Sequence, residues 1–128
     1  MTEFSINKAT RIMRAGDEFS KTNQKLKEAV WAFIEWLHGM VGDHGLQHQE
    51  IGWIIEKTGP KQIRLSVYTD KEGWVGVVTN SDKASIDQII TLCQAIAGPE
   101  MERLTLWLDE QVEERKKMAE NVELAMKK

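Results

Sequence analysis

The stretch from Gln62 to Asn80 constrains the fold most, because its residues follow the pattern of a β-hairpin. Apolar and polar residues alternate in its first half, a polar group ending in Gly follows at 70–73, and a β-rich run continues to residue 79. With 70–73 as the loop, Thr69 faces Trp74. One face then carries Ile63, Leu65, Val67, Trp74 and Val78. The other carries Arg64, Ser66, Tyr68, Val75, Val77 and Thr79.

A third strand is predicted from Ile51 to Lys57, with a turn at Gly59-Pro60. The competing interpretation is a helix from about Gln47 to Lys57, which Thr58-Gly59-Pro60 would stop. Gly52 and the β-branched residues favour the strand. In that case Ile54 joins the face of Tyr68, and Trp53 joins the face of Leu65.

Two helices are predicted before the sheet. Ser5 is a candidate cap for a short helix from Ile6 to Ala15, which Gly16 would end. A longer helix would begin at Asp17 or Ser20 and run to about Val41. Its apolar stripe comprises Leu26, Ala29, Val30, Phe33, Leu37 and Met40. Trp31 and Trp36 lie beside that stripe, so the helix is either buried on two sides or in contact with a partner.

Two more helices are predicted after the sheet. Residues 80–82, Asn-Ser-Asp, have the composition of a helix start, and a helix is predicted from Lys83 to Ala97. Its apolar face comprises Ile86, Ile89, Ile90, Cys93, Ile96 and Ala97. Gly98-Pro99 separates it from a last helix that begins near Glu100. A strict heptad would put Gln111 and Arg115 of that helix at core positions. We therefore expect its second half to be less buried, or to pack on another chain.

The sequence as a whole indicates a single α+β domain over residues 1–128: N-terminal helices, a two- or three-stranded antiparallel meander and two C-terminal helices. The charged fraction is 29% and the net charge is −3, with both signs mixed in every segment, so we expect no nucleic-acid partner. A single cysteine, no signal-peptide pattern and no long apolar run predict a cytoplasmic protein that does not bind a membrane.

No catalytic or cofactor motif is present in the sequence. His38, His44 and His48 lie close together, and two His four apart on a helix can share a metal, but Gly45 falls between His44 and His48. Cys93 lies in an apolar helix face, where a thiol is usually a core residue. We predict no enzyme, metal or cofactor. The alternative is a small enzyme or metal-binding protein that uses His44, His48 and Cys93 if they converge.

The function that this pattern favours is protein binding by a small adaptor, inhibitor or chaperone-like module that forms a homodimer. The motive is the second face of the predicted sheet, which carries more apolar residues than a solvated face should. The candidate interface residues are Ile54, Arg64, Tyr68, Val75, Val77, Trp31 and Trp36. The alternative is that a helix of the same chain covers that face.

Overall fold

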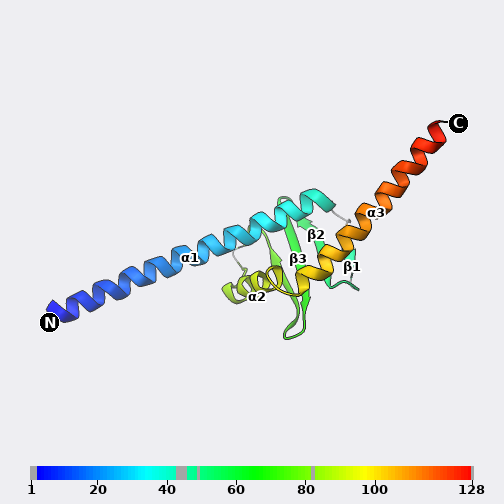
Figure 1. The fold of residues 1–128 in the computed structure, drawn as a ribbon. Helices are drawn as coiled ribbons and strands as arrows, with labels where there is room; N and C mark the ends of the chain where they lie inside the picture. The colour runs from blue at the N-terminus through cyan, green and yellow to red at the C-terminus, as the bar shows by residue number, and fades with distance from the viewer. Residues whose placement is uncertain (1–2, 43–45, 49, 82, 128) are drawn as a thin grey trace.

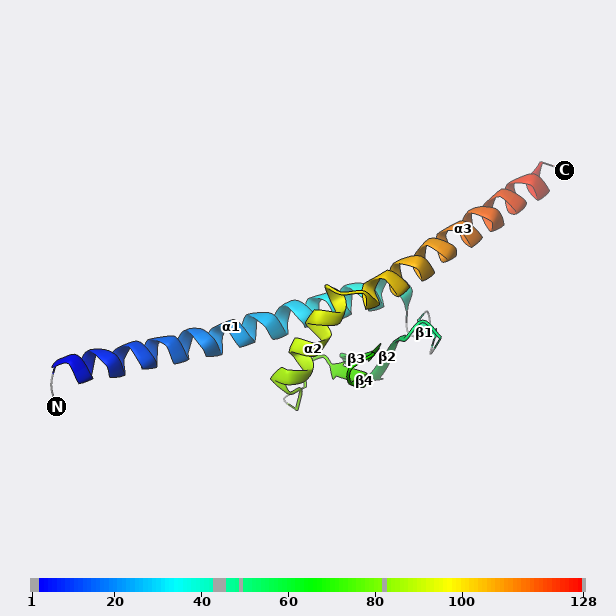
Figure 2. The same cartoon turned by 60° about the horizontal axis from the view of Figure 1, so that its bottom comes forward.

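The computed structural model describes residues 3–42, 46–48, 50–81 and 83–127, and its fold is α+β as predicted. The elements in chain order are α1 (Glu3–Val41), β1 (Gln47–His48), β2 (Trp53–Gly59), β3 (Gln62–Thr69), β4 (Gly73–Val78), α2 (Ile86–Ile96) and α3 (Glu100–Met126). The strands form an antiparallel sheet in the order β1-β2-β3-β4. All three helices lie on one side of the sheet (Figures 1 and 2).

The prediction of two separate N-terminal helices is wrong, because α1 is one helix of 39 residues. Gly16 lies inside it, and a Cβ at that position would have no neighbour within 4 Å. A glycine in a helix interior costs only about 1 kcal/mol relative to alanine and does not block the next hydrogen bond, as proline would. At 1.5 Å per residue, α1 is roughly 58 Å long.

The strand interpretation of the segment after Gly52 is confirmed, and β1 adds a fourth strand to the predicted two or three. Gly52 directly precedes β2 with a φ of 74°, and a Cβ there would lie 2.8 Å from the Arg103 guanidinium. Only glycine fits both that backbone conformation and that close approach. Arg103 in turn donates to the Tyr68 carbonyl oxygen at 2.6 Å, which ties α3 to the end of β3.

The predicted register of the β3–β4 hairpin is wrong by one residue. Thr69 pairs with Gly73, so the loop has three residues rather than four. Gly73, the residue that follows the loop, takes a φ of 69°, a left-handed conformation that glycine adopts without strain. Thr69 Oγ1 donates to the Gly73 carbonyl oxygen at 3.0 Å and accepts from the Glu72 amide at 3.1 Å. The shift turns Val75 and Val77 inward and leaves Trp74 exposed.

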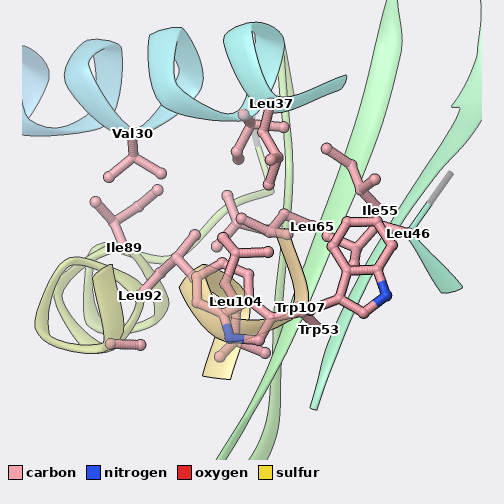
Figure 3. Close-up of a cluster of buried hydrophobic side chains, with 14 residues drawn as sticks. Val30, Leu37, Leu46, Trp53, Ile55, Leu65, Ile89, Leu92, Leu104 and Trp107 are labelled. Carbon is pink, nitrogen blue, oxygen red and sulfur yellow. The ribbon is translucent and has the colours of Figure 1, made fainter. Parts of the chain in front are cut away.

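The core lies between the sheet and the three helices, and Figure 3 shows side chains from every layer meeting there. The largest of its fully buried side chains is that of Trp53. Its other members are Val30, Ile34, Leu37, Leu46, Ile55, Leu65, Val67, Val77, Ile89, Leu92, Ala95, Leu104 and Trp107. Burial is confirmed for Leu65, Ile89 and Leu104. Ile90 was expected on the same face as Ile89 but is 39% exposed.

The start of α2 also differs from the prediction. Ser85 is the N-cap, and its hydroxyl accepts from the Gln88 amide at 3.2 Å. The Gln88 side chain accepts from the Ser85 amide in return, which completes a capping box. Asn80 instead takes a φ of 58° and donates from its side chain to the Lys61 carbonyl oxygen. The polar run at 80–82 is therefore part of the connection between β4 and α2.

Two helical arms extend beyond this core. Residues 6–22 of α1, here called the α1 arm, leave it on one side, and residues 112–126 of α3, the α3 arm, leave it on the other (Figures 1 and 2). Every residue of both arms is exposed.

Candidate interaction surfaces

The α1 arm exposes large apolar side chains that sequence reasoning did not select. Ile12 and Met13 are each 72% exposed and Phe19 is 69% exposed. A solvated helix normally carries polar residues all round. In the sequence, Ile12, Phe19 and Leu26 are spaced by seven residues, and this spacing continues across Gly16. It is the signal that identifies Ile12 and Phe19.

The α3 arm has the same character. The expectation that the second half of the last helix is less buried is confirmed. Its exposed apolar side chains are Val112, Met118, Val122, Leu124 and Met126. Packing of this arm on another chain stays a prediction.

A groove of about 270 Å³ lies where α3 leaves the core, beside the end of α1. Its walls include Met40, Val41, Trp107 and Leu108. Arg115 also lines it, and its guanidinium donates to the Gln111 side-chain oxygen at 2.7 Å. The guanidinium is thereby turned back along its own helix, and the groove is apolar at its base.

The outer face of the sheet has no helix over it in the part of the chain that the structure describes (Figure 2). Of the predicted residues, Ile54 is half-buried on this face, while Arg64 and Tyr68 are exposed. The Tyr68 ring meets the Trp74 ring edge-on, with centroids 5.7 Å apart. Val75 and Val77 do not belong to this face, because the corrected register places them in the core.

The two predicted tryptophans of α1 differ. Trp31 is half-buried against the core, and the Lys27 ammonium lies 4.9 Å from its ring centre. The Trp31 indole nitrogen is buried and lacks a hydrogen-bond partner among the described residues. Trp36 is 59% exposed and touches Phe33, with ring centroids 6.0 Å apart. Of these two tryptophans, only Trp36 therefore presents a broad aromatic surface to solvent.

The structure describes only some of the residues on which the enzyme alternative depends. His44 lies outside the described residues, so the convergence of His44, His48 and Cys93 is not part of the described geometry. The His48 ring lies 5.4 Å from that of Trp107. Cys93 is half-buried in α2, and burial raises the pKa of its thiol. Within the described ranges, no group of three or more His, Cys, Asp or Glu could hold a metal ion.

A cavity of about 380 Å³ lies between the β3–β4 loop and the junction of α2 and α3. Its charged lining residues are Asp70, Lys71, Glu72 and Glu100. Cys93, His38 and His48 do not line it.

Searches of family models, of curated proteins and of solved structures found no match to this chain. Within the described part of the chain, each helix is too short or too polar to cross a bilayer.

Proposed function

We propose that this protein is a protein-binding module that self-associates as a homodimer through its α1 arm. One observation carries the proposal: residues 6–22 form a helical arm with three large apolar side chains at about 70% exposure, and no described part of the chain covers them. Full burial of one such side chain stabilises a complex by about 1.5–3 kcal/mol. Helices of this length without packing are marginal in water, so a partner also favours the helical conformation.

The α1 arm is a better site for self-association than the outer sheet face. With Val75 and Val77 in the core, that face carries Ile54, Tyr68, Trp74 and Val78 as an apolar surface that Arg64 interrupts. An ion pair of 4.0 Å between Arg64 and Glu56 adds further polarity. The outer face and the α3 arm then remain accessible to a second protein, which suits an adaptor, inhibitor or chaperone-like role.

The proposal is tested by the mass of the full-length protein in solution. Sedimentation velocity over a wide concentration range should show a monomer–dimer equilibrium. Phe19→Glu should shift that equilibrium toward the monomer by at least tenfold, because it puts a charge into the contact surface. Asn7→Glu adds the same charge to the opposite side of the same arm and should leave the equilibrium within about twofold. A parent protein that is monomeric at every concentration would refute self-association.

A further inference from the structure

The apolar side chains of the α1 arm continue the face by which the same helix packs on the core. Val30 and Leu37 are buried in the core, and Leu26 and Phe33 pack at its edge. Two series with intervals of seven contain these residues and extend into the arm: Ile12, Phe19, Leu26, Phe33 and Met40, and Ala9, Gly16, Asn23, Val30 and Leu37. Such a repeat presents one apolar seam along a helix. Where α1 packs on the core, the seam faces the sheet. Along the α1 arm, the seam is exposed to solvent.

Large and small residues alternate along the open seam. In an antiparallel pair of α1 arms centred on residue 14, Ala9 lies opposite Phe19 of the second copy, and Gly16 lies opposite Ile12 of the second copy. A large side chain therefore meets a small one in each layer, which is the arrangement that fills a helix–helix contact without overpacking.

The charges of the arm favour the same orientation. Residues 6–14 carry three basic side chains, Lys8, Arg11 and Arg14, and no acidic one. Residues 15–22 carry Asp17 and Glu18, with Lys21 as their only basic side chain. Antiparallel pairing sets the basic half against the half that contains both carboxylates. Parallel pairing would set the basic half against itself.

A hollow of about 230 Å³ lies at the base of the arm, where it meets α2. Asn23 and Lys27 line it from α1, and Ile86 and Ile89 line it from α2. Pairing centred on residue 14 brings Ile6 of the second copy level with residue 22, beside this hollow. Ile6 is 52% exposed in the single chain.

Pairing of the α1 arm with the α3 arm of a second copy joins two different surfaces. The two arms leave the core on opposite sides (Figures 1 and 2), so a single contact of this kind leaves one arm of each copy unpaired. An α1–α1 contact is symmetric about a two-fold axis, so it forms a closed dimer.

From these observations we infer that the partner of the α1 arm is the α1 arm of a second copy, in an antiparallel two-helix seam centred near residue 14. This inference rests on the proposed homodimer. It assigns the apolar residues Ile12 and Phe19 to the contact and leaves the α3 arm outside it.

The test uses single cysteines and a short bifunctional maleimide on the full-length chain, with Cys93→Ala to remove the native thiol. In the proposed antiparallel pair, Ala15→Cys places one thiol of each copy on the same side of the helix pair. The two thiols are offset by roughly 3 Å along the helices. Ala9→Cys, the matched control on the same arm, separates its thiols by roughly 15 Å along the helices. Circular dichroism and the melting temperature confirm that each variant is folded.

The expected result is a covalent dimer for Ala15→Cys and little or none for Ala9→Cys. A mixture of Ala9→Cys and Phe19→Cys proteins should also cross-link, because those positions face each other. Efficient self-cross-linking of Ala9→Cys would mean a parallel pair and would overturn the inference. The absence of cross-linking in a protein that sediments as a dimer would overturn the inference and leave the proposed homodimer standing. A parent that sediments as a monomer would overturn both.

Discussion

The Trp53 indole nitrogen donates a hydrogen bond of 2.8 Å to the carbonyl oxygen of Glu100, the first residue of α3. Trp53 is fully buried at the start of β2, so the bond joins the sheet to a helix 47 residues later in the chain. The contact fixes where α3 begins on the sheet. Together with the Arg103 bond to Tyr68, it sets the direction in which the α3 arm leaves the core.

Trp53→Phe should lower the free energy of unfolding by about 1–3 kcal/mol, because it removes the donor from a buried carbonyl and leaves a small void. Urea denaturation followed by circular dichroism measures the loss. Trp74→Phe is the control, since Trp74 is 45% exposed and is not part of the core. A similar effect for both variants would contradict the importance of the Trp53 bond.

The hairpin register predicts opposite behaviour for two adjacent valines. Val77 is 1% exposed and faces the core, while Val78 pairs with Arg64 on the outer face. Val77→Ala should cost about 1–3 kcal/mol of stability, and Val78→Ala about 1 kcal/mol or less. Chemical denaturation of both variants distinguishes the registers, because a four-residue loop would reverse the order.

The capping box of α2 provides a third test. Ser85→Ala removes the hydroxyl that accepts from the Gln88 amide and should destabilise the protein by about 0.5–2 kcal/mol. Ser81→Ala alters the polar run that the sequence suggested as the helix start. Its effect on the melting temperature should be clearly smaller. Equal effects would argue that α2 begins earlier.

Burial raises the pKa of the Cys93 thiol, so the stability of the protein should depend on pH. The folded state holds the thiol proton more tightly than the unfolded state, whose thiol titrates near about 8.5. Stability should therefore fall as the pH rises above that range. Cys93→Ala should flatten the alkaline part of the stability curve. Thiol modification at pH 7 should be slower than for an unfolded reference peptide, and equally fast modification would show that Cys93 is accessible and unshifted.

Local patterns were sufficient to predict much of this fold. Alternation identified β3, and the β-branched residues favoured β2, but β1 was not predicted. Helical periodicity identified most of the surfaces by which α1 and α2 pack on the core. The register was not predictable from alternation, because apolar residues occupy consecutive positions at 74, 75, 77 and 78 and either parity leaves an apolar face. The deciding contacts are those of Thr69 with Gly73 and Glu72, which stabilise the shorter loop.

The candidate surface was harder to predict for a different reason. Whether Phe19 is core or surface depends on where the sheet ends beneath α1, and that is a tertiary property. Gly16 suggested a helix end, and this interpretation separated Ile12 from Phe19 although they lie on one face of one helix. A repeat of seven that crosses a glycine is the local signal that outweighs the glycine.

Amide hydrogen exchange of the unmodified full-length protein tests the central claim most directly. At low concentration, amides within residues 6–22 should exchange quickly, because every residue of that part of α1 is exposed. As the concentration rises, the same amides should become protected while those of residues 30–37 stay unchanged. Rapid exchange of residues 6–22 at every concentration, with no change in sedimentation, would contradict the account.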